Sequence, residues 1–174
     1  MEEIPDTLAN MVVIFLADWA KKDGGLPISV VIVGVNPLVE IAKRSMNGAM
    51  PISSMLCWQK AYTTVMTKKD TIFWADWQAK GKCIDNFCDP NFTAFPGAKV
   101  IYDPEEPKKV LGAIGVSGRN GRKETTDKLL QDHELAGLGA RYLEELLAAH
   151  QKKTGSLKSK KQHKSKRAQS FQKN

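Results

Sequence analysis

The sequence has few cysteines and no long apolar run. The first shortage argues against a secreted protein held by disulfides, and the second argues against a membrane-spanning protein. Only 3 of the 174 residues are cysteine, an odd number that leaves at least one thiol outside any set of disulfides. The N-terminus carries Glu2, Glu3 and Asp6 instead of the basic residues of a secretory leader, and the apolar run at residues 11–17 is too short to cross a bilayer. We therefore expect an intracellular, cytoplasmic protein in a reducing compartment, with no membrane partner.

Several short motifs of nucleotide-binding proteins and hydrolases are also missing. The sequence contains no Walker-type phosphate loop and no serine in a nucleophile elbow. Gly112 and Gly115 lie in an apolar strand that leads into a loop, without the spacing of a dinucleotide-binding fingerprint. They instead leave room for a helix, another backbone or a ligand to approach closely. Cys83 and Cys88 have the spacing of half a metal site, but no second pair lies nearby.

The positive charge of the chain is confined to its C-terminal end. The formal net charge is +7, but residues 151–174 contain nine Lys or Arg and no acid, which leaves residues 1–150 with 17 basic and 19 acidic side chains. A nearly neutral body argues against a nucleic-acid-binding face on the folded domain. A nucleic-acid partner or nuclear localisation would therefore depend on the basic end of the chain. Because that end has too few apolar residues to form a core, we expect a domain of residues 1–150 and a disordered basic tail of residues 151–174.

The apolar pattern predicts an α+β domain. The expected elements are a helix at residues 4–19, strands at 28–35 and 38–42, helices at 53–66 and 71–77, strands at 99–102 and 110–116, and a helix at 129–149. Antiparallel hairpins with segregated helices favour the α+β class over a doubly wound sheet. The runs at 28–35 and 110–116 are apolar on both faces, so we expect them to be inner strands.

Four segments carry a set of motifs in a fixed order. They are the hairpin at residues 28–39, a loop with Arg44, Asn47-Gly48-Ala49 and Pro51-x-Ser53, the helix motif Lys60-Ala61-x-Thr63, and a C-terminal half with Phe95-Pro96-Gly97, residues 110–118 and Gln131-Asp132-x-Glu134-Leu135-Ala136. Taken together, over roughly residues 4–148, these segments resemble the GlcG/HbpS-like family, also called heme-degrading-domain proteins.

The resemblance implies a fold, a function and an assembly. The fold would be profilin-like, with a five-stranded antiparallel sheet and helices on both faces, although the residues reveal only four strands. The function would be small-molecule binding, with a pocket for heme or another organic acid, in a homo-oligomer. Asn36-Pro37 replaces the Gly-Gly turn of the family, and residues 82–91 and 117–132 look longer than its pattern. Such loops often build pockets, so the ligand can differ from the family's usual one.

The residues that match the family motifs form the candidate site. The expected ligand-binding residues are Arg44, Thr63, Phe95, Pro96, Gly97 and Ser117. The Lys60 ammonium would hold a propionate or carboxylate, or would be an ordinary solvated helix residue. Asp132 and Glu134 would form a carboxylate pair for iron or for acid–base work, but acids at the start of a helix also stabilise the helix itself.

The metal ligand and the function of the protein both have open alternatives at this point. His133 would be the metal ligand because iron porphyrins favour axial histidine, with His150 and Tyr62 as further options, but a surface histidine fits the sequence equally. An alternative function is a cofactor-independent isomerase or lyase that uses Lys60 with Asp132 and Glu134 as acid and base. A third is a scaffold domain whose tail carries the targeting.

Overall fold

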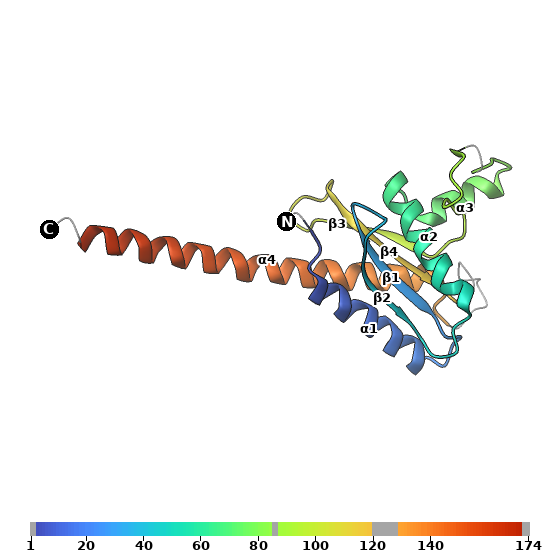
Figure 1. Ribbon diagram of the computed structural model, residues 1–174, viewed down its shortest axis with the longest axis horizontal. Helices are drawn as coiled ribbons and strands as arrows, with labels where there is room; N and C mark the ends of the chain where they lie inside the picture. The colour runs from blue at the N-terminus through green and yellow to red at the C-terminus, as the bar shows by residue number, and fades with distance from the viewer. Residues whose placement is uncertain (1–2, 85–86, 120–128, 172–174) are drawn as a thin grey trace.

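Two pairs of consecutive strands are separated and flanked by helices along the chain, which is an α+β arrangement (Figure 1). The computed structural model describes residues 3–84, 87–119 and 129–171. Its elements are α1 (Asp6–Lys22), β1 (Ser29–Gly34), β2 (Glu40–Ser45), α2 (Pro51–Thr67), α3 (Thr71–Ala79), β3 (Ala98–Tyr102), β4 (Val110–Ser117) and α4 (Asp132–Phe171). Within these ranges no helix is both long enough and apolar enough to span a membrane.

The strands form one antiparallel sheet in the order β2-β1-β4-β3. The two strands that are apolar on both faces, β1 and β4, are the inner pair, as predicted, with Ser29 opposite Ser117 and Ile32 opposite Ile114. The α+β class is confirmed, but the expectation of five strands is wrong for the described residues, which form four. The long connections next to β3 contain prolines such as Pro90 and Pro104, which cannot donate a hydrogen bond to a further strand.

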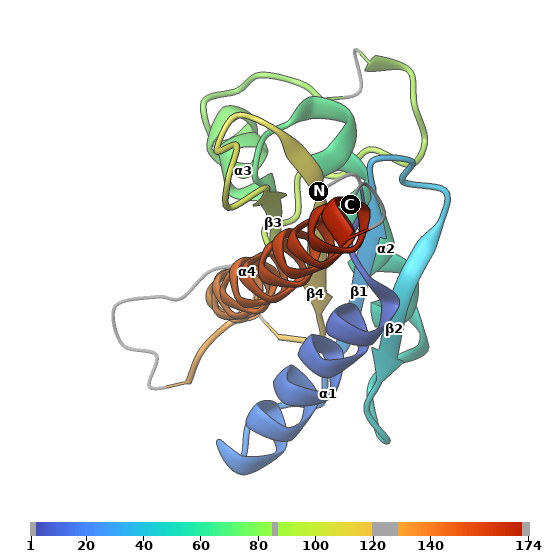
Figure 2. The same ribbon diagram turned by 90° about the vertical axis from the view of Figure 1, so that its left-hand side faces the viewer.

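Helices cover both faces of the sheet (Figure 2). Along β1, Val31 and Val33 face α2, while Val30 and Ile32 belong to the larger core formed with α1 and α4. The predicted close approach at Gly115 is made by α2, since a Cβ there would collide with the carbonyl oxygen of Cys57. Glycine at this position therefore sets how closely α2 packs on the sheet.

The second strand begins two residues later than predicted. Asn36 holds the hairpin turn, because its side-chain oxygen accepts a hydrogen bond from the backbone N–H of Leu38 at 3.2 Å and its carbonyl accepts one from Val39 at 3.1 Å. These bonds occupy the residues that the apolar pattern assigns to the strand, so pairing starts at Glu40. As a result Arg44, expected in a loop, lies within β2.

The last helix is longer than the sequence predicts. Its apolar face indicates an end near residue 149, and the composition predicts disorder beyond it, but α4 continues through Phe171 and projects past the sheet (Figure 1). Lys and Gln are good helix formers, and a helix already docked on the sheet removes the cost of starting a new one. The domain boundary at residue 150 stays a prediction, since α4 crosses it without a break.

Candidate functional site

Lys60 and Asp132, two of the three residues expected to do acid–base work, meet in a buried ion pair. The Lys60 Nζ lies 2.8 Å from Asp132 Oδ2 and also donates a hydrogen bond to the carbonyl oxygen of Val116 at 2.9 Å. The two side chains are only 3% and 2% exposed. The second carboxylate oxygen of Asp132 accepts a hydrogen bond from the backbone N–H of Arg119 at 3.0 Å. The pair therefore connects α2, the end of β4 and the start of α4.

Gly97 closes over this pair. Its φ of +134° lies in a region that favours glycine, and a Cβ added there would lie 2.6 Å from the Val116 carbonyl oxygen and 2.8 Å from the Lys60 Nζ. Burial raises the pKa of Asp132, while the Lys60 ammonium and the Arg119 N–H act in the opposite direction. The geometry is that of a structural bridge, because both charged side chains are almost fully buried and are engaged with each other.

Two other expected ligand residues, Thr63 and Ser117, are also buried and contact neighbouring segments of the protein. Thr63 donates its hydroxyl to the Gln59 carbonyl at 2.9 Å and accepts a hydrogen bond from the Thr93 N–H at 2.9 Å, which ties the loop before β3 to α2. Ser117 is 4% exposed at the end of β4. Lys60, Gly97, Ser117 and Asp132 thus gather at one end of the sheet, but as a packed region.

The remaining predicted ligand residues lie on the surface and do not join one pocket. Phe95 is 61% exposed and Pro96 is half-buried, in the loop that enters β3. Arg44 is exposed on β2, the opposite edge strand, and shares a sheet face with the buried Ala42 on the α1 side. Because Lys60 approaches from α2 on the other face, the structure does not bring Arg44 and Lys60 together.

The residues next to Asp132 serve the start of α4. A carboxylate oxygen of Glu134 accepts a hydrogen bond from the backbone N–H of Gln131 at 3.1 Å, as in a helix-capping box. This is the ordinary helix-stabilising role that the sequence leaves open for the acids here. His133 is half-buried, and the described part of the chain has no group of three or more His, Cys, Asp or Glu side chains placed to hold a metal ion. Its role as a metal ligand stays a prediction.

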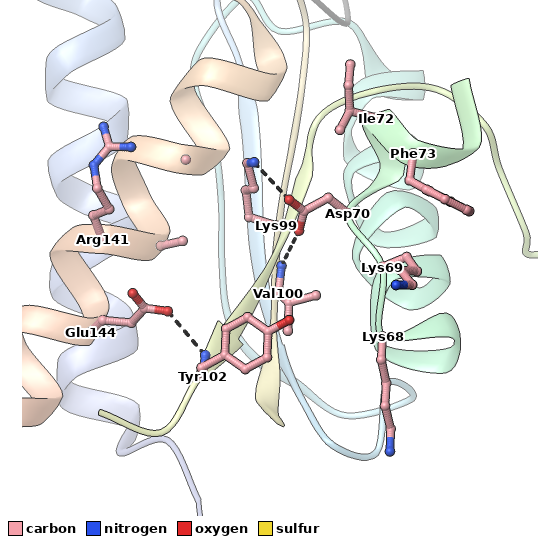
Figure 3. Close-up of a pocket in the computed structure, with 12 residues that line it drawn as sticks. Lys68, Lys69, Asp70, Ile72, Phe73, Lys99, Val100, Tyr102, Arg141 and Glu144 are labelled. Carbon is pink, nitrogen blue, oxygen red and sulfur yellow. Dashed lines mark hydrogen bonds and ion pairs between the residues drawn. The ribbon is translucent and has the colours of Figure 1, made fainter. Parts of the chain in front are cut away.

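A groove that the sequence analysis missed lies between α3, β3 and α4 (Figure 3). Its volume is about 500 Å³. It is lined by Lys68, Lys69, Asp70, Ile72, Phe73, Lys99, Val100, Tyr102, Gly137, Ala140, Arg141 and Glu144. The apolar wall comes from α3 and β3, and the small residues Gly137 and Ala140 of α4 leave the space open.

The charges of this groove are unevenly paired. Asp70 binds the Lys99 ammonium at 2.8 Å and the Val100 N–H at 3.0 Å, and Glu144 accepts a hydrogen bond from the Tyr102 N–H at 3.2 Å (Figure 3). Both acids are thereby engaged with β3. Within the described residues, no carboxylate forms an ion pair with the other three cations, Lys68, Lys69 and Arg141. The groove therefore favours an anion beside an apolar surface.

The position of the two lysines follows from how α2 ends. Lys68 is the C-cap of α2 and adopts a left-handed conformation with a φ of +54°, which turns the chain toward α3. Lys69 then lies 5.6 Å from the centre of the Phe73 ring. A basic pair at the end of a helix is common, so only the fold shows that Arg141 and Tyr102 lie at the same groove.

The comparison with known families gives a match over most of the chain. A family model described as "Haem degrading protein HbpS-like" matches residues 4–137. This chain belongs to the HbpS-like family. No curated protein sequence matches it.

Solved structures share the fold of this HbpS-like chain at low sequence identity. Klebsiella pneumoniae protein ORFY aligns with a TM-score of 0.67 and 18% identity, over 82% of this chain and 92% of that protein. HbpS aligns with a TM-score of 0.63 and 20% identity, over 84% and 92%. A PduOC:heme complex aligns with a TM-score of 0.61 and 20% identity, over 78% and 89%. At these identities the likeness establishes the fold alone.

Proposed function

We propose that this HbpS-like chain binds heme or another flat organic anion in the groove between α3, β3 and α4. The observation that carries the proposal is the combination of an apolar wall with Lys68, Lys69 and Arg141, none of which has a carboxylate partner among the described residues. Binding pockets are typically apolar with a few converging polar groups, and the groove's volume of about 500 Å³ lies within their usual size. The family description and the heme held by the PduOC relative support heme as the first ligand to test.

The residues of the groove fit the parts of a heme. Ile72, Phe73 and Val100 offer apolar contact to the ring. The three cations offer charge-assisted hydrogen bonds to the propionates. Tyr102, which is 38% exposed, would offer its phenol oxygen to the heme iron, since tyrosine is a known ligand of heme iron. The bound iron would supply redox chemistry.

The alternative of an isomerase or lyase receives no such support from the described geometry. It relies on Lys60 and Asp132, which are engaged with each other and buried beneath Gly97. Glu134, its third residue, caps α4. A ligand-binding domain is therefore the function that the geometry favours.

A hemin titration followed in the Soret band tests the proposal. We expect saturable binding by the native chain and at least about a 10-fold weaker affinity for Lys68→Gln/Lys69→Gln, since charged hydrogen bonds contribute about 1.5–3 kcal/mol. The matched control, Lys80→Gln/Lys108→Gln, removes two exposed lysines outside the groove. Equal weakening by both variants, or no saturable binding by the native chain, would reject the proposed site.

A further inference from the structure

We propose that the C-terminal part of α4, residues 151–171, binds the phosphate backbone of nucleic acid. The proposal is independent of the groove, which is lined by residues no later than Glu144. It starts from the unequal distribution of charge. Residues 151–174 contain nine Lys or Arg and no acid, whereas residues 1–150 have a net charge of −2. The net positive charge that would attract a long polyanion therefore lies at this end of the chain.

The helical backbone organises this charge in space. Residues 158–167 contain six Lys or Arg, and at a rise of about 1.5 Å per residue they extend over about 15 Å. A nucleic-acid duplex carries about one negative charge per 1.7 Å of its axis, so a duplex segment of this length carries enough phosphate charge to neutralise this stretch. In Figure 1 this part of α4 projects beyond the sheet, away from the nearly neutral body. A long partner can therefore reach it without contacting the domain.

The same charges oppose the helix when no partner is present. Lys160 and Lys164 are four residues apart, and like charges at this spacing destabilise a helix. Phosphates that neutralise them remove this repulsion. We therefore expect binding to increase the helical content of the segment. A segment that is partly disordered alone, as its composition predicts, would then adopt on the nucleic acid the helix that the structure shows.

Composition favours nucleic acid over a membrane surface. Membrane-surface helices bury a wide apolar face that includes Trp, Phe or Leu. Between residues 151 and 171 the only apolar side chains are Leu157, Ala168 and Phe171. The attraction is then electrostatic and sequence-independent, as is typical of contacts made only to phosphates.

The test measures binding of the full chain to a labelled DNA duplex of about 20 base pairs by fluorescence anisotropy at several salt concentrations. The variant Lys158→Gln/Lys160→Gln/Lys161→Gln/Lys164→Gln removes four charges and keeps good helix formers. We expect at least about a 10-fold weaker affinity at low salt and a salt-dependence slope reduced by up to about 4. Circular dichroism should show a duplex-induced gain of helix in the native chain that the variant lacks.

A matched control variant separates this role from a general effect of net charge. Lys21→Gln/Lys22→Gln/Lys80→Gln/Lys108→Gln removes four exposed lysines of the body. Retained duplex binding by this control supports the proposal. Equal weakening by the two variants, or no duplex binding by the native chain at low salt, would overturn it. Binding to phosphatidylserine vesicles without duplex binding would also overturn it, in favour of a membrane surface.

Discussion

The Lys60 ammonium and the Asp132 carboxylate lie 2.8 Å apart with almost no access to water, and they join α2 to the start of α4. Removing one partner would leave the other charge buried and uncompensated, which costs far more than the net value of the pair. We therefore expect Lys60 and Asp132, two of the three residues that the sequence analysis proposes for catalysis, to contribute strongly to the stability of the domain.

The first prediction concerns this ion pair. Lys60→Met should lower the free energy of unfolding by about 3–5 kcal/mol, because it leaves the Asp132 carboxylate without its ammonium partner. Lys60→Met/Asp132→Leu should recover a large part of that loss, since no isolated charge remains. Urea denaturation of the native chain and both variants measures the effect. A double variant less stable than Lys60→Met would contradict the claim that the unpaired Asp132 carboxylate causes the loss of stability.

The second prediction concerns the combined cost of close contacts and backbone conformation at Gly97. Gly97→Ala places a Cβ 2.6 Å from the Val116 carbonyl oxygen and also imposes an unfavourable φ. Gly81→Ala is the control, since Gly81 has a φ of +75° but no atom within 4 Å of its added Cβ. We expect the control to lose about 1 kcal/mol and Gly97→Ala clearly more in thermal or urea unfolding. Equal losses would show that neither the close contacts of Gly97 nor its φ of +134° adds to the cost of alanine at a positive φ.

The sequence predicted those parts of the fold that follow from a local apolar pattern. The inner strands β1 and β4 are apolar on both faces, and both are found in the centre of the sheet. The start of β2 was predicted incorrectly because the side chain and carbonyl of Asn36 hold two backbone N–H groups that the apolar pattern does not reveal. The end of α4 was missed for a related reason, since the apolar pattern stops while the helical backbone continues.

The candidate site was less predictable because it depends on contacts between distant segments. Family motifs indicate Lys60 and Asp132, but their burial depends on the position of Gly97, which lies on a third segment. The groove cations come from the end of α2, from β3 and from α4, and no short motif contains them. The family motifs therefore indicate residues of one site, but they do not show which of those side chains are buried and which are exposed to solvent.

The third prediction concerns acid stability and the pair Asp23–Arg119. The two carboxylate oxygens of Asp23 lie 2.7 and 2.8 Å from the guanidinium nitrogens of Arg119, whose side chain is 2% exposed. The Arg119 hydrogen bonds hold the pKa of Asp23 below its ordinary value of 3.8. Since the folded pKa is the lower one, the stabilisation is fully present above the ordinary pKa and is lost as the pH falls through the folded value.

The corresponding experiment compares Asp23→Asn with the native chain as the pH is lowered. The stability difference between them should be constant near neutral pH and should shrink below a pH of about 4. Asp18→Asn is the matched control, because Asp18 is an exposed residue of α1, the helix whose C-cap is Asp23. A stability difference that grows on acidification would contradict a folded-state pKa of Asp23 below its ordinary value.

The fourth prediction is that the chain forms a homo-oligomer through the β2 edge. Large apolar side chains are exposed on the neighbouring hairpin and at the start of α2, namely Val35, Leu38, Val39, Met50, Ile52 and Met55. A sheet edge beside such a surface promotes association. Light scattering should show at least a dimer, and Leu38→Ser/Val39→Ser should dissociate it. Leu26→Ser, at another exposed site, should not, and a native chain that is monomeric at every concentration would reject the prediction.

The last prediction concerns the reactivity of the three thiols. Cys57 is buried between α2 and the sheet, and this burial raises its pKa to about 12, whereas Cys83 and Cys88 are exposed. Relative to the ordinary value of 9.0, such a pKa lowers the thiolate population about 1,000-fold near neutral pH. A thiol-specific chromogenic reagent should therefore modify two cysteines per native chain, and the third only after unfolding in denaturant. Cys57→Ala should leave the native count unchanged and lower the denatured count to two, whereas rapid reaction of all three native thiols would contradict the burial of Cys57.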